Sequence, residues 1–392
     1  MQSAKCALAF VFALGAARLS AVPANTALVE AETFSDFGGW VLDAQFMDQM
    51  GSPYLLAHGL GKPVKDAATT VRLPAAGTYR VWARTKDWVA QWKAPGAPGR
   101  FRVLLDGQPL ATEFGAEGAL WHWQDGGTVT LAQTQVTVAL RDLTGFEGRC
   151  DAILFSQDAA WRPPDDGPGL AALRRQLSGR PEAPEPGGDY DLVVAGGGIA
   201  GTCAAVSAAR LGLRVALVQD RPVLGGNNSS EVRVWLQGAR NKEPWPRVGD
   251  VVAELEQAKQ AHYGPANTAE LYEDEKKLAV ARAETNLTLV LQHRVIAAES
   301  DGTRIRAAIA QDALTGRRLR FAARYFADCT GDGDLGAYAG AELEMTPTGH
   351  MGPCNLWNVK DTGESQPFPR CPWALDLADK PFPGRSKEKP VP

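Results

Sequence analysis

The sequence predicts a multidomain chain in which an antiparallel β-sandwich is followed by an α/β domain with a Rossmann-like sheet. Three observations support this fold class: evenly spaced short strands over residues 29–156, a strand–glycine turn–helix–strand unit over residues 191–220, and a proline- and glycine-rich stretch between them. The chain has 392 residues, of which 45% are apolar, so it can bury one large or two ordinary cores. We expect a signal peptide at 1–24, a sandwich at 27–157, a linker at 158–188 and the second domain at 189–392.

The first 24 residues have the layout of a secretory signal peptide. Lys5 is followed by an apolar run from Cys6 to Ala17 and then by small residues that precede cleavage near Ala21 or Ala24. The run is shorter than the roughly 20 residues needed to span a bilayer, so a permanent anchor is the less favoured alternative. We therefore expect an exported protein, periplasmic or extracellular, without stable membrane insertion.

Charge and cysteine content exclude several classes of partner. The formal net charge is −4, and it becomes −6 once the two cations of the signal, Lys5 and Arg18, are removed. No basic run is present, so we expect no nucleic-acid partner. The cysteines that remain after Cys6 are odd in number and lack metal-ligand spacing, so we interpret them as packing residues; they are Cys150, Cys203, Cys329, Cys354 and Cys371.

Short strands with alternating apolar and polar residues fill the first half of the chain. They read TVRL, TYRVWAR, RFRVLLDG, TVTLA, QVTVALRD and CDAILFS, and the turn signals between them are PAAG, PGAPG, DGQ and DGG. No helix-period run interrupts them. The pattern favours an antiparallel sandwich over a parallel sheet.

Three stretches of this half, VEAETF, LPAAGTYRVWAR and GRCDAILFS, resemble carbohydrate-binding modules with a galactose-binding-like jelly roll. The resemblance covers about 130 residues and implies a structural Ca²⁺ held by Glu30, Glu32 and Asp151, whose oxygens suit a hard cation. The alternative is that Glu30 and Glu32 alternate on a strand and face solvent. The resemblance also implies a carbohydrate, or a small molecule derived from one, as the partner.

The same half is rich in tryptophan, and flat indole faces can stack on sugar rings. We expect Trp82, which lies within TYRVWAR, to be a core residue. Trp88 and Trp92 lie in the loop-like KDWVAQWKAPG and are the better candidates for sugar stacking. Between the two halves, only residues 169–179 of the expected linker predict a short helix.

The glycine turn at the start of the second half predicts a dinucleotide-binding site. Gly196, Gly198 and Gly201 follow the apolar strand LVVA in GxGxxG register and precede the helix TCAAVSAARLG. Gly196 permits the tight turn, Gly198 lets a pyrophosphate approach the backbone, and Gly201 lets the helix pack closely. The free amides at the helix start, near Ile199 and Ala200, favour phosphate.

The second strand of this unit, RVALVQ, ends where such domains usually place an acidic residue for the adenosine ribose. Gln219 stands there, followed by Asp220. An amide oxygen can accept a hydrogen bond, and Asp220 serves instead if the backbone shifts slightly, so both stay candidates. Arg221 is the nearest cation, and the pattern does not support a 2′-phosphate.

Two later segments distinguish flavin from nicotinamide. RPVLGGNNSSEVRVW resembles the second motif of FAD enzymes of the glutathione-reductase type, with Asn227 in place of the usual arginine. FADCTGDGDLGAYAGAE resembles the strand-end motif that closes over FAD. The resemblance adds the following cofactor residues: Gly225, Gly226, Asn227, Ser230, Val295 at the adenine, Thr330, Gly331 and Asp332. A strand ending at Val295 and two β segments with a turn at LTGRR are expected between the two motifs.

Taken together, the four motifs over residues 189–358 resemble the FAD-dependent oxidoreductase family that is sometimes labelled xanthan-lyase-like. The resemblance implies FAD held without covalent attachment. An NAD-linked enzyme is the weaker alternative, because the glycine pair and the TGD segment favour flavin.

We therefore expect an FAD-dependent oxidoreductase that acts on a sugar or polysaccharide-derived substrate by hydride transfer. His350, in a polar loop after the third motif, is the candidate base; the alternative is a surface histidine. The proline-rich end after Trp357 shows no return to the FAD domain, so we expect a C-terminally incomplete domain. The rival hypothesis is a carbohydrate-binding protein whose dinucleotide-binding fold does not turn over.

Overall fold

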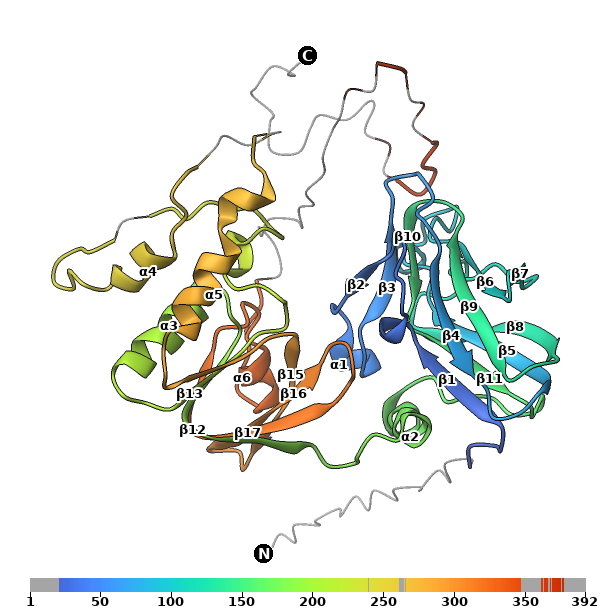
Figure 1. Cartoon of the computed structure of the whole chain (residues 1–392), viewed down its shortest axis with the longest axis horizontal. Helices are drawn as coiled ribbons and strands as arrows, with labels where there is room; N and C mark the ends of the chain where they lie inside the picture. The colour runs from blue at the N-terminus through green and yellow to red at the C-terminus, as the bar shows by residue number, and fades with distance from the viewer. Residues whose placement is uncertain are drawn as a thin grey trace, which may run out of the picture.

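The structure is a computed structural model, and Figure 1 shows its two lobes. It describes residues 21–346 except 239, 261–263 and 265, together with 361, 363–365, 367, 369–374 and 376. His350 and residues 1–20 of the expected signal peptide lie outside these described residues. Strand β12 leaves the N-terminal lobe beside helix α2 and enters the second lobe (Figure 1).

Antiparallel strands build the N-terminal lobe, as predicted. They form three sheets, in the orders β1-β11-β5-β8, β10-β3-β2 and β4-β9-β6-β7, around one apolar core. The strands are β1 (Thr26–Glu30), β2 (Val41–Asp43), β3 (Tyr54–His58), β4 (Ala67–Arg72), β5 (Gly77–Thr85), β6 (Phe101–Leu105), β7 (Gln108–Pro109), β8 (His122–Leu131), β9 (Gln135–Asp142), β10 (Phe146–Cys150) and β11 (Ala152–Ser156). The short helical elements are η1 (Ala31–Thr33), α1 (Met47–Met50) and η2 (Ala90–Trp92).

One predicted turn in this lobe is wrong. The DGG stretch lies inside β8, where the register against β5 shifts, because a bulge takes up the extra residue. Gly127 adopts a φ of 83°, and the Asp125 carboxylate accepts its N–H at 2.9 Å. Aspartate and glycine therefore serve a strand bulge here, with the same chemistry that they would bring to a hairpin turn.

The segment expected to be a linker contains helix α2 (Gly167–Ser178) and the first residues of β12. Leu170 and Leu173 of α2 pack with Trp82, Trp161 and neighbouring apolar residues on the outer face of the first sheet. Strand β5 is consequently buried on both faces, so its burial does not alternate toward its C-terminal end. Trp82 is a core residue, as expected.

The second lobe is built on a mixed six-stranded sheet of order β14-β13-β12-β17-β16-β15, which confirms the predicted α/β class. The first four strands of this order are parallel, and β16 and β15 add antiparallel at one edge. The strands are β12 (Glu185–Ala195), β13 (Val215–Val218), β14 (Leu287–Val290), β15 (His293–Ser300), β16 (Ile305–Asp312) and β17 (Arg318–Asp328). The helical elements are α3 (Ile199–Arg210), η3 (Gly226–Asn228), α4 (Asp250–Leu255), η4 (Ala269–Tyr272), α5 (Asp274–Arg282) and α6 (Asp334–Tyr338).

The single strand expected to end at Val295 is two strands, β14 and β15. Gln292, between them, has a φ of 56°, so the chain turns there from the parallel part of the sheet into the antiparallel edge. The alanines of α3 pack on one face of the sheet with Val194 and Leu217. Small side chains let this helix lie close to the strands, which places its N-terminus beside the end of β12.

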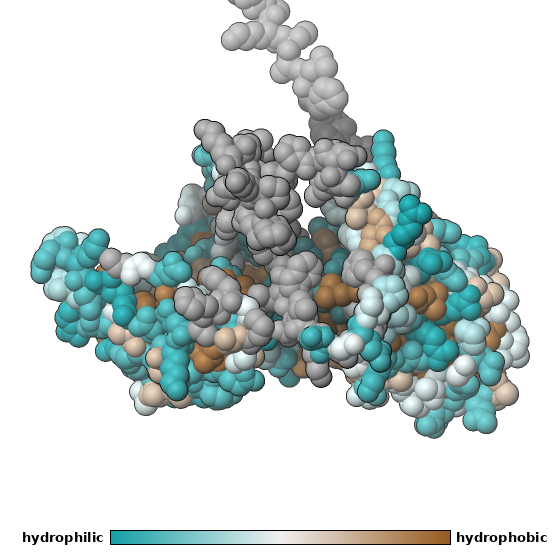
Figure 2. Space-filling model, turned by 90° about the horizontal axis from the view of Figure 1, so that it is seen from above, coloured by the Kyte–Doolittle hydropathy of each residue, from teal (hydrophilic) through white to brown (hydrophobic). Residues whose placement is uncertain are grey.

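The two lobes touch along a small contact beside β15. The apolar part joins Ala44 and Met47 of the sandwich to Ala313, and Arg294 Nη1 donates to the Ala44 carbonyl at 3.2 Å. In the face shown in Figure 2, hydrophilic residues prevail along the outer edges of both lobes. Within the described part of the chain, no helix is both long enough and apolar enough to cross a membrane.

Candidate cofactor-binding site

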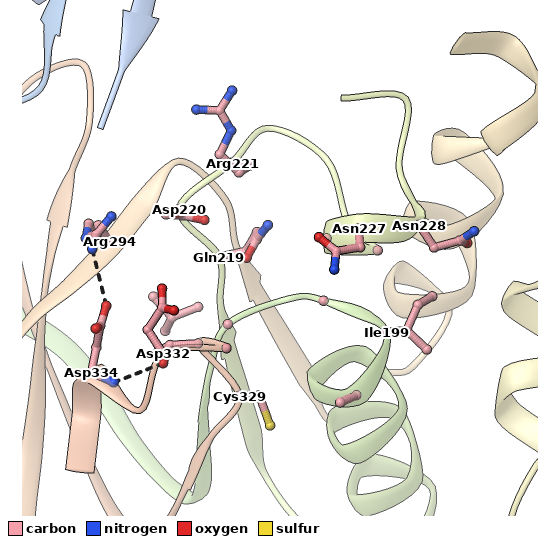
Figure 3. A pocket seen from close by; sticks show the side chains of 18 of the residues that line it. Ile199, Gln219, Asp220, Arg221, Asn227, Asn228, Arg294, Cys329, Asp332 and Asp334 are labelled. Atoms are coloured by element: carbon pink, nitrogen blue, oxygen red, sulfur yellow. Dashed lines mark hydrogen bonds and ion pairs between the residues drawn. The ribbon is translucent and has the colours of Figure 1, made fainter. Parts of the chain in front are cut away.

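A cavity of about 460 Å³ opens at the carboxyl ends of β12, β13 and β17 (Figure 3). In the sheet, β12 lies between β13 and β17. In open α/β sheets ligands bind outside the carboxyl ends of the strands. The glycine turn, the end of β13, the glycine pair, the start of β15 and the loop after β17 all contribute to its wall. The cavity therefore joins the four motifs that the sequence singles out.

The glycine turn is shaped by contacts that admit no side chain at two of its positions. Gly196 has a φ of 98°, and a Cβ there would lie 2.2 Å from the carbonyl oxygen of Cys329. A Cβ on Gly201 would lie 1.9 Å from the carbonyl oxygen of Gly196, which explains the close approach of α3 to the turn. Both glycines are needed for the fold, and Gly201 does not itself line the cavity.

Gly198 is different, because it faces open space. It precedes the first residue of α3 with an ordinary φ of −60°, and a Cβ added to it would meet nothing within 4 Å. The first hydrogen bond of the helix runs from the Thr202 N–H to the Gly198 carbonyl. The N–H groups of Ile199 and Ala200, on the cavity wall, therefore have no partner within the helix. Open space at a helix start is a cradle for a diphosphate.

Gln219 does not face the cavity with a free amide. Its Oε1 accepts the Gly197 N–H at 2.7 Å, and its Nε2 donates to the Val223 carbonyl at 3.1 Å. The buried Gln219 side chain therefore braces the glycine turn. Asp220 also lines the cavity, and among the described residues its carboxylate has no hydrogen-bond partner, so of the two candidates Asp220 is the available acceptor.

The glycine pair holds the opposite wall. A Cβ on Gly225 would lie 2.3 Å from the Asn228 carbonyl oxygen, and one on Gly226 would meet the Gly198 Cα at 3.1 Å. Asn227 extends toward the cavity (Figure 3). The buried Asn228 amide donates to the Val234 carbonyl at 2.9 Å and to Gln257 Oε1 at 3.2 Å, so this side chain supports the loop that carries the glycine pair.

The loop after β17 is held by its own side chains. The Thr330 hydroxyl donates to Asp328 Oδ1 at 2.7 Å and accepts the N–H groups of Gly333 and Asp334, both at 3.1 Å. Burial by itself would raise the pKa of Asp328, but hydrogen bonds from Gly336 and Thr330 lower it below its ordinary value. Asp328 thus stays ionised and fixes the loop that carries Gly331 and Asp332.

Two arginines stand at the rim of the cavity, and both have carboxylate partners. Arg221 forms two hydrogen bonds of 2.8 Å to Glu231, and Arg294 Nη2 lies 3.2 Å from Asp334 Oδ2 (Figure 3). Arg294 also contacts the sandwich through the Ala44 carbonyl. It is therefore a link between the rim of the cavity and the other lobe.

The structure brings together on the cavity wall 14 of the 16 residues predicted to hold the cofactor. The two others are Gly201 and Ser230. Ser230 lies off the wall because its N–H donates to Asp274 of α5 at 3.1 Å, which turns this residue toward the helix. Sequence reasoning missed several wall residues, namely Asn228, Trp235, His293, Arg294 and Asp334. Four of the five lie within two positions of a predicted residue, and Trp235 is the last residue of the RPVLGGNNSSEVRVW motif, so proximity to the motifs was the available signal.

The carboxylates expected to bind calcium are arranged differently from the expectation. Glu30, Glu32 and Asp151 are all buried, which rules out the solvent-facing alternative for the two glutamates. The guanidinium of Arg174 enters between them and pairs with Glu30 and Asp151. Burial raises the pKa of Glu32 well above its ordinary value. Among the described residues no group of three or more His, Cys, Asp or Glu side chains is arranged to hold a metal ion, and because Arg174 lies between these carboxylates, the cluster does not fit Ca²⁺.

The two candidate stacking tryptophans have different surroundings. The Trp88 ring packs edge-on against Trp92, with centroids 6.1 Å apart, and against Trp373, with centroids 5.4 Å apart. The guanidinium of Arg149 lies 5.3 Å from the centre of the Trp88 ring. Trp92 keeps 64% of its surface exposed, so its ring is the more accessible of the two.

The fold and the cavity define a dinucleotide-binding domain, and part of this domain matches a known family. Residues 191–357 match the sequence model of the FAD-dependent oxidoreductase family. This part of the chain is thus an FAD-dependent oxidoreductase domain, and FAD is the cofactor that the family implies. No curated protein matches the chain.

Solved structures similar to each half are related only distantly. One is a geranylgeranyl bacteriochlorophyll reductase-like protein from Thermoplasma acidophilum, with 18% identity over 39% of this chain and 42% of that chain, and a TM-score of 0.29. Another is a myxobacterial FAD-dependent chondrochloren halogenase, with 17% identity over 38% of each chain and a TM-score of 0.27. A family 35 carbohydrate-binding module from Clostridium thermocellum shows 15% identity over 34% of this chain and 98% of that chain, with a TM-score of 0.26. This chain spans less than half the length of the reductase-like protein and of the halogenase.

Proposed function

We propose that this protein is an exported enzyme that binds FAD without covalent attachment and oxidises a sugar or a polysaccharide-derived compound. The cavity at the mouth of α3 is the observation that carries the proposal. It combines the open space at Gly198, the free amides of the first helical turn and the Asp220 carboxylate on the wall. These features suit a ligand with a diphosphate and several hydrogen-bonding groups.

Each wall of the cavity has a role in this proposal. The amides of Ile199 and Ala200 hold the diphosphate, the Asp220 carboxylate accepts from a ribose hydroxyl, and the main chain of Val295 contacts adenine. Asn227 and Asp332 face the remaining length of the cofactor. When bound, FAD supplies the centre that accepts the hydride, so the protein must position the substrate and take up a proton. His350 is the residue that we propose for the proton.

The sandwich directs the enzyme to its substrate in this proposal. Family 35 and family 36 carbohydrate-binding modules are among the structures similar to this lobe. Trp92 offers an exposed ring, which can stack on the C–H face of a sugar. If this proposal is right, Trp92→Ala releases the protein from an insoluble polysaccharide that retains wild type, while the FAD spectrum is unchanged. Equal retention of both proteins would contradict a role for Trp92.

Export is supported by the layout of residues 1–24. Expression of the full chain in a secreting bacterium tests it directly. We expect the protein outside the cytoplasm, with an N-terminus near residue 22 or 25 by mass spectrometry. An intact N-terminus in the cytoplasm would contradict export without affecting the proposal for FAD.

The absorbance spectrum of the purified protein is the first test of the enzyme proposal. We expect the visible band of oxidised flavin, either directly or after incubation with excess FAD and removal of the unbound cofactor. Addition of a panel of mono- and oligosaccharides without oxygen should then bleach the band for at least one sugar. A protein that stays colourless contradicts the proposal. A protein that is coloured but never bleached by a sugar it binds supports the rival, a carbohydrate-binding protein without turnover.

A further inference from the structure

In the sandwich, the acidic cluster formed by Glu30, Glu32 and Asp151 already has cationic partners, and these are arginine side chains of the same chain. Asp151 is 0% exposed, and its Oδ2 receives guanidinium nitrogens from Arg84, at 2.9 Å, and from Arg174. Arg174 also pairs with Glu30 Oε2 and donates to the Ser52 hydroxyl at 2.6 Å. The Ser52 hydroxyl in turn donates to Asp151 Oδ1 at 2.7 Å, which closes the network.

Arg174 is held in this cluster by the helix that carries it. Leu170 and Leu173 fix α2 against Trp82 and Trp161, so the helix face that bears Arg174 is turned toward Glu30. The residue is 4% exposed, although arginine is almost never buried unless it is paired. Apolar packing and ion pairing therefore fix the same helix position.

The charges of the cluster match those of a divalent ion. Arg84 and Arg174 bring two positive charges to Asp151 and Glu30, and Arg180 lies farther out, 3.9 Å from Glu30 Oε1 and 4.0 Å from Glu32 Oε1. A calcium ion would bring two positive charges to the same oxygens. A guanidinium and a calcium ion cannot both contact Glu30 and Asp151 in this space.

We propose that Arg174 is the built-in cation of the sandwich, in the place where the sequence resemblance implies a calcium ion. The sandwich then folds without metal, and the cluster that would bind Ca²⁺ serves to dock α2, which leads into β12. Removal of the guanidinium lets Glu30, Glu32 and Asp151, which are not arranged for a metal ion while Arg174 lies between them, move together into a divalent-cation site. The inference is independent of the proposed enzyme function.

Thermal unfolding of the full-length protein with calcium and with EDTA tests this inference. We compare wild type, Arg174→Gln and the matched control Arg175→Gln, which removes the same charge from the next position of α2, outside the cluster. Wild type and the control should show the same Tm with either addition. Arg174→Gln should unfold about 10 °C lower in EDTA and should recover at least half of that loss in calcium.

Three outcomes overturn the proposal: a wild-type Tm that falls in EDTA, an Arg174→Gln protein as stable in EDTA as the control, or a destabilised Arg174→Gln protein that calcium does not rescue. If Arg174→Gln does not fold, terbium luminescence sensitised by the sandwich tryptophans decides the question on wild type. A saturable terbium signal that calcium displaces would contradict an arginine-filled site. Its absence supports the proposal.

Discussion

The acidic cluster of the sandwich and the cavity of the FAD domain are both places where the sequence implies a bound group, and the structure treats them in opposite ways. At the cluster, Arg174 and Arg84 pair with Asp151, and Arg174 also pairs with Glu30, while the oxygens of Glu32 have no hydrogen-bond partner among the described residues. At the cavity, space stays open beyond Gly198, and Asp220 lines the wall without a hydrogen-bond partner among the described residues. One site is closed by the chain itself and the other is kept open.

The difference teaches that a motif alone does not specify a ligand. Both sites preserve their motif residues in the expected positions, yet only one leaves room for a ligand. Buried charges need partners of opposite charge. An arginine side chain of the same chain has an advantage over a free ion, because its pairing with the carboxylates involves no loss of entropy of association. An open cavity at the end of a sheet has no such internal partner, so it fits an external ligand.

The largest effect is expected from Asp151→Asn, which would break the closed site. The change removes the carboxylate that both Arg84 and Arg174 contact, so two buried guanidinium groups lose their shared anionic partner. We expect a loss of about 3–5 kcal/mol in the free energy of unfolding of the sandwich. Denaturant unfolding followed by tryptophan fluorescence measures it.

Asp166→Asn is the matched control. Asp166 is exposed, stands at the start of α2 and makes no side-chain capping bond, so we expect a change within about 0.5 kcal/mol. Equal stability of the two variants would show that the ion pairs do not hold the sandwich together.

The next largest effect is expected from Gly198→Ala, which tests the open site. Its added Cβ meets no protein atom within 4 Å and needs no unusual φ, so the fold should be unchanged, while the methyl group occupies the space proposed for the diphosphate. We expect FAD to bind roughly 10- to 100-fold more weakly. Titration of the apoprotein, followed by quenching of flavin fluorescence, measures the affinity.

Gly336→Ala is the control for this change. A Cβ on Gly336, in α6, meets only Asp328 Oδ2, at 3.7 Å, and Ala341 Cβ, at 4.0 Å, which are ordinary contacts. This variant should bind FAD like wild type and should unfold at the same or a slightly higher temperature. If Gly198→Ala and Gly336→Ala had the same FAD affinity, the diphosphate would have to bind elsewhere.

The fold was predictable from the sequence because local patterns determine it. Alternating strands gave the sandwich, and the strand–turn–helix unit gave the α/β domain and most of the cavity wall. The exceptions have local causes: the DGG stretch forms a bulge in β8, and Gln292 divides an expected strand into two. Such choices depend on the register with a partner strand, which a single segment does not reveal.

The arrangement of charges was less predictable, because it depends on contacts distant in sequence. Arg174 lies 144 positions from Glu30, within a segment whose composition indicates a linker. Gln219 occupies the expected ribose position, but its amide is used by Gly197 and Val223. Motifs therefore located both sites, and only the three-dimensional contacts showed which atoms were free.

A smaller effect is expected from Asp220→Ala, which sharpens the account of the open site. Asp220 is the acceptor that remains for the ribose once Gln219 is engaged in the glycine turn. Loss of a hydrogen bond to a charged group at a partly exposed position should weaken FAD binding about 10-fold. Glu299→Gln is the control, because it disturbs only an exposed ion pair with Arg320 away from the cavity and should change affinity less than about threefold. An unchanged affinity for Asp220→Ala would remove Asp220 from the site.

The smallest effect concerns the cysteine thiols. It tests whether the two lobes differ in how readily a reagent reaches their thiols, as well as in how their charges are paired. Burial, with a smaller contribution from the charge of Glu254, raises the pKa of Cys203 to about 11. The thiolate is the reactive form, and at about pH 8 only about one Cys203 thiol in a thousand is ionised, so the rate of labelling by iodoacetamide should rise about tenfold for each unit of pH toward that pKa. Cys150, which is fully buried in the sandwich, should stay unlabelled until the lobe unfolds.

FAD should affect the labelling of Cys329 and Cys203 differently, because Cys329 lines the cavity and Cys203 does not. Bound cofactor should therefore slow the labelling of Cys329 and leave that of Cys203 unchanged, as measured by mass spectrometry of the labelled peptides. Rapid labelling of Cys203 near neutral pH would mean that its thiol is activated rather than packed. The interpretation of the cysteines as packing residues would then be wrong for Cys203 of α3, the helix whose N-terminus lies at the cavity.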